Sequence, residues 1–263
     1  MLLTVGDARI HYERAGAGFP VILLHAGNAD SRMWELQVAE FAKHFDVIRP
    51  DHRGFGKSEL PPERWSEIGD VLALMDELHL ERAHLVGCSM GGAIAMDFAL
   101  QHAERVSKLV LVGPAVGGIT FFDRYPDLFV EVRAARKSGD VEELTLAEMH
   151  LLLDGPMRPH GYVKGSVREL FSDMNRIRLA TDFNSAPDVE IDPPAAQRLN
   201  EITPAALVVI GEADAPWVVD NVALLMEKLP RARKFVIHDA GHYPNLEHPD
   251  EFNRVVLEFL LGD

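Results

Sequence analysis

Cysteine, basic residues and long apolar runs are all scarce in this sequence. Cys88 is the only cysteine among 263 residues, which excludes an intrachain disulfide, suits a reducing compartment and leads us to predict a cytoplasmic protein. Lysine and arginine number 26 against 41 aspartates and glutamates, and the formal net charge of −15 argues against nucleic acid or an anionic membrane surface as a partner. No apolar stretch approaches the roughly 20 residues that cross a bilayer, and residues 1–12 do not resemble a signal peptide.

Apolar runs typical of strands alternate with helical patterns over much of the chain. Eight such runs lie at residues 1–5, 8–13, 20–24, 45–48, 83–86, 106–112, 205–210 and 234–237. Continuous apolar runs separated by helical segments indicate strands that are buried on both faces of a parallel sheet. The pattern therefore predicts an α/β fold in which a mostly parallel, eight-stranded sheet is flanked by helices.

The alternation stops in the middle of the chain. Residues 114–203 show no clear strand pattern and are rich in phenylalanine, leucine and methionine, with breaks near Gly139, Gly155 and the prolines at 193–194. We predict that this segment is a helical cap inserted into a core domain formed by residues 1–113 and 204–263. Some of its apolar side chains should line the space between the cap and the core.

A G-x-S-x-G pattern at residues 87–91 stands between an apolar run and a helix-prone run. This context predicts a nucleophile elbow, a sharp strand-to-helix turn that exposes the central Ser89 at a helix N-terminus. Side chains at Gly87 or Gly91 would collide with the neighbouring strand and helix. Because the elbow exposes only its central residue, we expect Cys88 to be buried and to point away from the site.

A serine hydroxyl needs a base and an acid that orients the base. His242 follows the last predicted strand, and Asp214 follows the strand before it. Since the carboxyl ends of parallel strands share one edge of a sheet, we expect both side chains to meet Ser89 there. Glu212 and Asp239 are the competing carboxylates, and we prefer Asp214 because Glu212 should point to the other side and Asp239 is too near His242 in sequence.

Stabilisation of a tetrahedral intermediate requires two backbone N–H donors. Met90, directly after the nucleophile, should supply one of them. The other should come from the loop at residues 25–28, which follows an early buried strand.

Five motifs in order resemble the α/β-hydrolase superfamily over essentially the whole chain. They are L-L-H-A-G at 23–27, D-H-R-G-F-G-K-S at 51–58, G-C-S-M-G-G at 87–92, G-E-A-D at 211–214 and G-H-Y-P-N-L-E-H-P at 241–249. Within the superfamily the sequence resembles cofactor-free esterases and 3-oxoadipate enol-lactonase-like hydrolases, which share the S-M-G-G elbow and the N-L-E-x-P ending. The resemblance implies an α/β-hydrolase fold, with the partners of the nucleophile in the order Ser, Asp, His.

The resemblance also implies roles for individual residues. Ser89 would be the nucleophile, His242 the general base and acid, and Asp214 the orienting carboxylate. Gly27 and Met90 would donate to the oxyanion, although this chain has His25-Ala26 where many relatives have His-Gly. Asp51 and Arg53 would tie loops together rather than catalyse.

We predict a serine hydrolase that cleaves a small or medium, largely apolar ester or lactone through an acyl-enzyme. Asn28, Trp217 and Tyr243 are the expected substrate contacts. Two alternatives use the same triad, a carbon–carbon bond hydrolase and a cofactor-free perhydrolase, and a third is a small-molecule receptor on this scaffold. The serine at the elbow excludes haloalkane dehalogenases and epoxide hydrolases, which need an aspartate there.

No cofactor or metal is expected, and the oligomeric state is left open. The histidines of the second half of the chain do not show the spacing of a metal-ligand cluster. These histidines are His150, His160, His238, His242 and His248.

Overall fold

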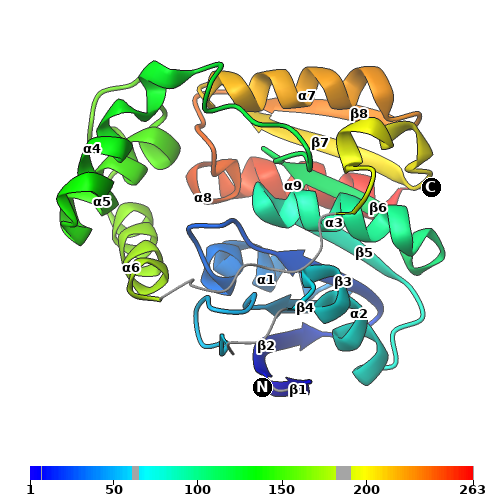
Figure 1. Ribbon diagram of the computed structural model, residues 1–263. Coiled ribbons are helices and arrows are strands. Elements are labelled where there is room, and N and C mark those ends of the chain that lie inside the picture. The colour runs from blue at the N-terminus through cyan, green and yellow to red at the C-terminus, as the bar shows by residue number, and fades with distance from the viewer. Residues whose placement is uncertain (7, 61–64, 182–190, 263) are drawn as a thin grey trace.

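Eight strands form one sheet in the computed structural model, which describes residues 1–6, 8–60, 65–181 and 191–262 (Figure 1). Their order across the sheet is β1-β2-β4-β3-β5-β6-β7-β8. β2 runs antiparallel to both of its neighbours, and the remaining neighbouring pairs are parallel. The predicted mostly parallel, eight-stranded sheet is therefore confirmed.

The strands coincide with the apolar runs of the sequence. They are β1 (Leu2–Val5), β2 (Ala8–Gly16), β3 (Phe19–Leu24), β4 (Phe45–Pro50), β5 (Ala83–Cys88), β6 (Val106–Val112), β7 (Ala205–Gly211) and β8 (Ala232–Ile237). Successive side chains of a strand point to opposite faces, so one run supplies two cores. In β3, Val21 and Leu23 belong to one buried cluster, and Ile22 and Leu24 belong to the other.

Helices cover both faces of the sheet (Figure 1). α2 (Glu67–Glu77), α3 (Met90–Gln101) and α7 (Pro216–Lys228) contribute buried residues to the cluster that contains Ile22. α1 (Glu35–Phe41) and α9 (Pro249–Leu261) contribute to the cluster that contains Val21. The short helix α8 (Pro244–Glu247) directly precedes α9.

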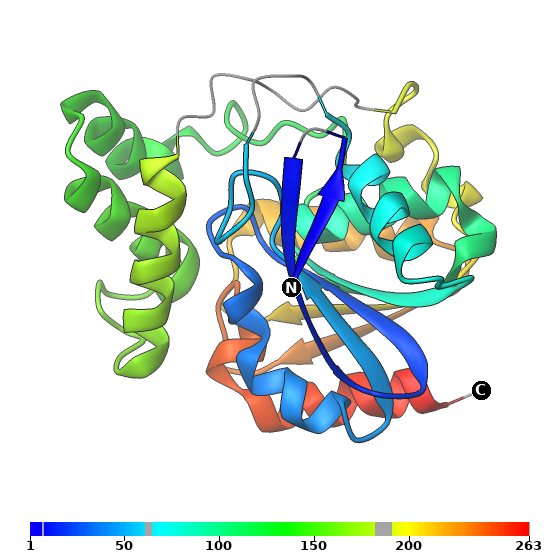
Figure 2. The ribbon, with the colours of Figure 1, turned by 90° about the horizontal axis from the view of Figure 1, so that it is seen from below.

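The segment between β6 and β7 is helical and contains no strand among its described residues. Its main elements are α4 (Val130–Ser138), α5 (Val141–Glu148), the π-helical turn η4 (Met149–Asp154) and α6 (Ser166–Ala180). These helices lie to one side of the sheet, on the left in Figure 1, and Figure 2 shows them projecting beyond the sheet and its flanking helices. They match the predicted helical cap; its limits, 114 and 203, remain a prediction, and residues 182–190 lie outside the described part.

The break between α4 and α5 follows from local chemistry. Gly139 has a φ of 76°, a left-handed conformation that glycine adopts without steric cost and that ends α4. Asp140 then accepts hydrogen bonds from the backbone N–H groups of Glu142 and Glu143 and caps α5. The predicted break at this position is confirmed.

Within the described residues, no helix combines the length and the apolar character needed to cross a membrane.

Candidate functional site

Ser89 occupies the sharp turn between β5 and α3. Its backbone has φ 51° and ψ −110°, outside the regions favoured by a residue with a side chain. A Cβ at Gly87 would lie 2.2 Å from the carbonyl oxygen of Gly91, and a Cβ at Gly91 would lie 2.2 Å from that of Leu24. The two glycines are thus required by close backbone packing, and the predicted elbow geometry is present.

The imidazole of His242 and the carboxylate of Asp214 are in contact. Nδ1 of His242 lies 3.0 Å from each carboxylate oxygen, and both residues are buried in loops that follow β8 and β7. The competing carboxylates have other partners: Glu212 accepts from the backbone N–H of Asp239, and Asp239 pairs with Arg158. Asp214 is therefore the carboxylate that meets His242.

Glycine at position 113 leaves room for this pair. A Cβ there would lie 3.0 Å from both Oδ2 of Asp214 and Nδ1 of His242. Gly113 follows β6, so three neighbouring strand ends shape the site.

The backbone around His242 is fixed from two sides. The N–H of Gly241 donates to Oε1 of Glu247 at 2.7 Å, and the N–H of His242 donates to the carbonyl of Leu152 in the cap at 3.3 Å. Burial raises the pKa of Glu247 to about 7, although Gly241 and Arg158 both favour its charged form. The position of the imidazole thus depends on a buried carboxyl group and on the cap.

Ser89 and His242 both line a cavity of about 390 Å³ between the core and the cap. The core contributes Gly27, Asn28, Ser89, Met90, Ala93, Trp217 and His242, and the cap segment contributes Ala115, Phe121, Phe122, Phe129, Val132, Arg133, Arg136, Glu148, Leu151, Leu152 and Arg178. Because Nδ1 of His242 faces Asp214, the other ring nitrogen remains available for chemistry on the cavity side. The arrangement suits abstraction of a proton from a serine hydroxyl.

Comparison with known proteins agrees with this geometry. The model of the alpha/beta hydrolase family matches residues 21–255. The chain belongs to the alpha/beta hydrolase family. The hydrolase is 32% identical to the 2-hydroxy-6-oxo-6-phenylhexa-2,4-dienoate hydrolase of Burkholderia cepacia, over 97% of this chain and 92% of the relative. It is 31% identical to a 2-hydroxy-6-oxononadienedioate/2-hydroxy-6-oxononatrienedioate hydrolase of Comamonas testosteroni, over the same shares of the two chains.

Among solved structures, the hydrolase resembles the enol-lactonase from Burkholderia xenovorans LB400. The two match with a TM-score of 0.80 and 26% identity over 100% of each chain. The expected α/β-hydrolase fold is therefore confirmed. The relatives are named for different substrates, so membership alone leaves the substrate of this hydrolase open.

The two expected oxyanion donors of the hydrolase lie side by side. A Cβ at Gly27 would contact Sδ and Cβ of Met90 at 3.5 and 3.7 Å. The N–H of the neighbouring Ala26 donates to Sδ of Met33 at 3.3 Å and is thus directed away from the cavity. Met90 is the first residue of α3, where an N–H has no carbonyl partner within the helix.

The loop that carries Gly27 is anchored by a buried histidine. Nδ1 of His25 donates to the carbonyl of Ala26 at 2.8 Å, and its Nε2 accepts from the N–H of His52 at 2.9 Å. Burial lowers the pKa of His25, which keeps it in this neutral tautomer. Asp51 also anchors this region, since it accepts from the N–H groups of Ser31 and Lys57.

Two of the three predicted substrate contacts line the cavity. Asn28 does so directly, and Trp217 stacks on Phe121 with ring centroids 5.2 Å apart. Tyr243 is fully buried and is not among the described residues that line the cavity. Its hydroxyl donates to Oδ1 of Asn28 at 2.9 Å, so it positions Asn28 from behind.

The charged residues of the cap wall were missed from sequence. Glu148 is buried, and its Oε1 lies 3.5 Å from Arg136 and 3.6 Å from Arg178. A helical-wheel argument could have found Arg178, because it lies four residues after the buried Met174 and seven after the buried Phe171, on the same face of α6. The phase of that face was unknown until the packing of the cap was seen.

Cys88 is fully buried, as expected from its place beside the nucleophile. Burial raises the pKa of its thiol well above the ordinary value, which disfavours the reactive thiolate. It therefore packs in the core and does not compete with Ser89.

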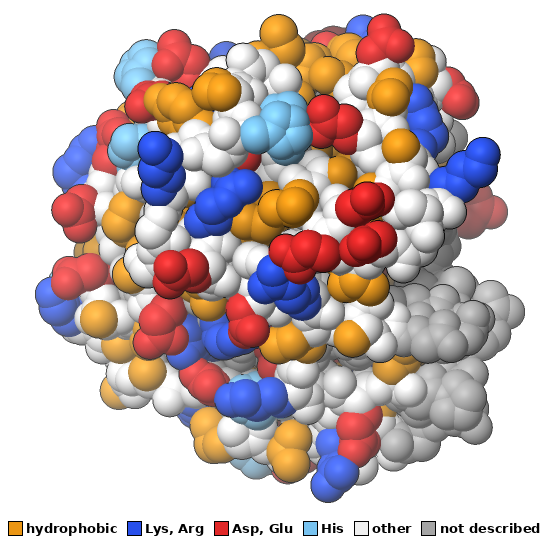
Figure 3. Space-filling model, turned by 90° about the vertical axis from the view of Figure 1, so that its left-hand side faces the viewer, with side chains coloured by type: hydrophobic (Ala, Val, Ile, Leu, Met, Phe, Trp, Pro, Cys, Tyr) orange, Lys and Arg blue, Asp and Glu red, His pale blue; other side chains and the backbone are white. Residues whose placement is uncertain are grey.

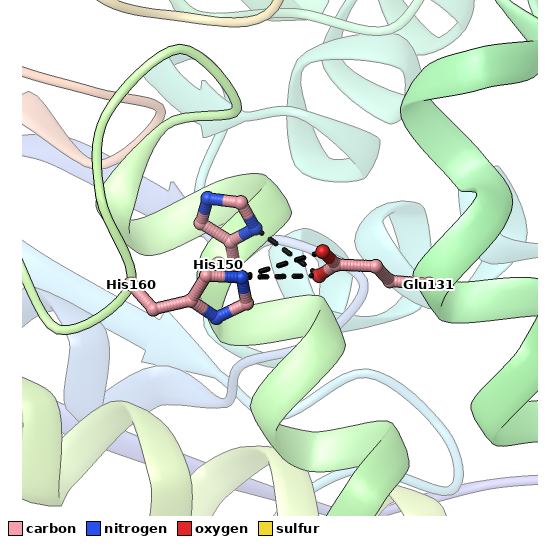
Figure 4. A group of neighbouring side chains, drawn as sticks. All are labelled: Glu131, His150 and His160. Atoms are coloured by element: carbon pink, nitrogen blue, oxygen red, sulfur yellow. Dashed lines mark hydrogen bonds and ion pairs between the residues drawn. The ribbon is translucent and has the colours of Figure 1, made fainter.

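The sequence shows no metal-ligand spacing among the histidines, but the structure brings two of them together. His150 and His160 stack with ring centroids 3.6 Å from each other, and both contact Glu131 (Figure 4). The sequence gives no helical spacing for this pair because His160 lies in a loop after η4.

Proposed function

We propose that this protein is a serine hydrolase that cleaves a small or medium ester or lactone through an acyl-enzyme at Ser89. The observation that carries the proposal is the contact of His242 with both oxygens of Asp214, together with the cavity that His242 shares with Ser89. A base that is oriented by a carboxylate and opens toward a serine is the arrangement that acyl transfer needs.

The chemistry follows from the orientation of the imidazole. Asp214 holds the proton on Nδ1 of His242, so the other ring nitrogen can take the proton of the Ser89 hydroxyl. Ser89 then attacks the substrate carbonyl carbon, and His242 returns the proton to the leaving alcohol oxygen. A water activated by His242 releases the acid from the acyl-enzyme.

The N–H groups of Gly27 and Met90 would hold the negative oxygen of the tetrahedral intermediate. Their adjacency supports this assignment, and so does the engagement of Ala26 with Met33, which removes the competing donor. Two fixed donors stabilise an oxyanion more than the ground-state carbonyl, which lowers the barrier.

The cavity favours a substrate with an apolar body and an anionic end. Four aromatic rings, those of Phe121, Phe122, Phe129 and Trp217, form one contacting group in its wall. Arg178 lines the same cavity, and a guanidinium is suited to bind a carboxylate.

Hydrolysis of a carbon–carbon bond is the second candidate. Its support is the 31–32% identity to hydrolases named for dienoate and dienedioate substrates, which carry both a carboxylate and a ketone. In that reaction Ser89 would attack the ketone carbon, and the released carbon would accept the proton instead of an alcohol oxygen. The aromatic rings and Arg178 suit a phenyl-bearing dienoate as well as an enol-lactone.

A substrate panel separates the candidates. We expect turnover of p-nitrophenyl esters or an enol-lactone, in parallel with 2-hydroxy-6-oxo-6-phenylhexa-2,4-dienoate, and complete inhibition by a serine-directed phosphonate that labels Ser89. Faster cleavage of the dienoate than of the esters would favour the carbon–carbon reaction. Formation of a peracid after hydrogen peroxide is added to the ester assay would indicate perhydrolysis. Hydrolysis that survives full phosphonate labelling would refute the mechanism. A ligand that raises the melting temperature, with no product burst from any substrate, would favour the receptor alternative.

A further inference from the structure

Three side chains of the cap converge outside the cavity of the proposed active site. Nδ1 of His150 lies 3.2 Å from Oε2 of Glu131, and Nε2 of His160 lies 3.3 Å from the same carboxylate (Figure 4). All three ligand atoms lie within 4.8 Å of one another. They come from α4, η4 and the loop that follows η4.

The hydrogen bonds of His150 determine where its proton resides. Its Nε2 lies 2.9 Å from the carbonyl oxygen of Arg158, which can only accept a hydrogen bond. A neutral His150 therefore carries its proton on Nε2 and presents the lone pair of Nδ1 to the Glu131 carboxylate. Two acceptors that face each other repel, and a cation between them removes the repulsion.

This arrangement is the one found around metal-binding histidines. Such a histidine donates its second ring N–H to a carbonyl or carboxylate, which fixes the tautomer and aims the free nitrogen at the metal. The carbonyl of Arg158 has this function for His150. The carbonyl anchor of His150 and the convergence of three ligand atoms within 4.8 Å are two separate observations that indicate a ligand.

Two of the three ligand spacings fit a small tetrahedral ion, and all three ligand atoms lie within 4.8 Å of one another. Bonds of about 2.0–2.1 Å to Zn²⁺ place neighbouring ligands of a tetrahedron roughly 3.3 Å apart. The two histidine–carboxylate distances, 3.2 and 3.3 Å, agree with such edges. Two histidines, one carboxylate and a water would complete the coordination of zinc.

We propose that Glu131, His150 and His160 form a divalent transition-metal site, with Zn²⁺ as the ion that the ligand set suits best. Histidine, acidic and basic side chains are interspersed on the face of the molecule that carries the cap (Figure 3). His160 and Glu131 are more than half exposed, so an ion can reach them from solvent.

Occupancy of the site would fix one wall of the cavity. Val132 follows Glu131, Leu151 follows His150, and both line the cavity on which the proposed function depends. An ion would join α4 to η4 and to the loop that carries His160. The metal site itself does not depend on the proposed function, because it shares no residue with the cavity lining.

Titration of the full chain with ZnCl₂, followed by calorimetry, tests the proposal. We expect one Zn²⁺ per chain and a higher melting temperature in its presence. Glu131→Gln and His160→Ala should each weaken binding by about tenfold or more, since a three-residue site cannot spare a ligand. Co²⁺ should give the intense visible absorption of a tetrahedral complex in the original protein and not in either variant.

The matched control is His238→Ala. His238 contacts Glu212 at 3.4 Å as an exposed histidine–glutamate pair that is not part of the three-residue group. Zinc affinity should not change in this variant. The proposal is overturned if Zn²⁺ fails to bind the folded protein. It is also overturned if Zn²⁺ binds the Glu131→Gln and His160→Ala variants as tightly as the original chain, which is the result expected if His242 and Asp214 bound the ion. A charged His150 paired with Glu131 would give the first of these results.

Discussion

The two walls of the active-site cavity are built in different ways. On the core wall, the imidazole of His242 is hydrogen-bonded to the carboxylate of Asp214, and the turn that carries Ser89 is fixed by close backbone packing. On the cap wall, one oxygen of the buried Glu148 has no hydrogen-bond partner among the described residues, and its other oxygen has only long contacts to Arg136 and Arg178.

This difference indicates that the core wall carries the catalytic groups and that the cap wall binds the substrate. Groups that act on a transition state work best when they are fixed before the substrate arrives. A buried carboxylate oxygen without a partner costs free energy, and a polar substrate group or water can remove that cost. We therefore expect substitutions on the core wall to lower kcat and substitutions on the cap wall to change KM and substrate preference.

Removal of the nucleophile should have the largest effect. Ser89→Ala eliminates the hydroxyl that we propose forms the acyl-enzyme, and we expect kcat to fall by on the order of a thousandfold or more. Initial rates on the best ester or dienoate of the panel measure this loss. Ser166→Ala, at an exposed position of α6, is the control and should keep full activity. Undiminished turnover by Ser89→Ala would contradict the division between the walls.

Asp214→Asn tests the orientation of the base. An amide at this position can donate to Nδ1 of His242 and thus favour the wrong tautomer, while the shape of the loop is kept. We expect kcat to fall by roughly a thousandfold or more with a small change in KM. A melting temperature close to that of the original protein must accompany the loss. A large rise in KM with an unchanged kcat would mean that Asp214 contributes to substrate binding and not to the orientation of His242.

The core wall could be predicted from sequence because its residues stand in short motifs at the ends of strands. An apolar run followed by Gly87 and Ser89 predicts a strand and a sharp turn. Asp214 and His242 follow late strands, and the ends of parallel strands meet at one edge of the sheet. The elbow was confirmed by the φ of 51° at Ser89. The sheet and its strands were likewise confirmed.

The cap wall could not be predicted because its contacts depend on helix phase and tertiary packing. Aromatic and leucine side chains in this segment were expected near the cavity, but sequence could not separate Phe121 from the other apolar residues. Arg178 lay on a helix whose buried face was unknown, and His160 met His150 only through a loop. Tyr243 was adjacent to His242 in sequence, yet it lies behind Asn28.

Arg178→Met tests recognition by the cap wall. Methionine keeps an apolar stem but loses the guanidinium, so a carboxylate-bearing substrate should lose a charge-assisted hydrogen bond and KM should rise roughly 10- to 100-fold. Neutral aryl esters should be affected little. Arg176→Met is the matched control, because Arg176 lies on the same helix and pairs with Glu142 at the surface. Equal effects on charged and neutral substrates would argue against a carboxylate site.

The carboxyl group that supports the His242 loop should affect stability and leave turnover nearly unchanged. Burial raises the pKa of Glu247 from 4.5 to about 7, whereas Arg158 and His248 favour its charged form. The folded protein therefore binds this proton more tightly than the unfolded chain does. The resulting stabilisation is fully present below about pH 4.5 and is lost as the pH rises to about 7.

Glu247→Gln makes this contribution measurable, because an amide oxygen can still accept from Gly241 but cannot titrate. Urea denaturation of both proteins at pH 5 and pH 8 gives the difference in unfolding free energy at each pH. We expect the original protein to lose up to about 3 kcal/mol relative to the variant between these values, since one pKa unit corresponds to about 1.4 kcal/mol. A difference that is independent of pH would mean that Glu247 titrates normally. The His242 loop would then rest on a carboxylate that is charged at both pH values, and the core wall, like the cap wall with Glu148, would contain a buried charged carboxylate.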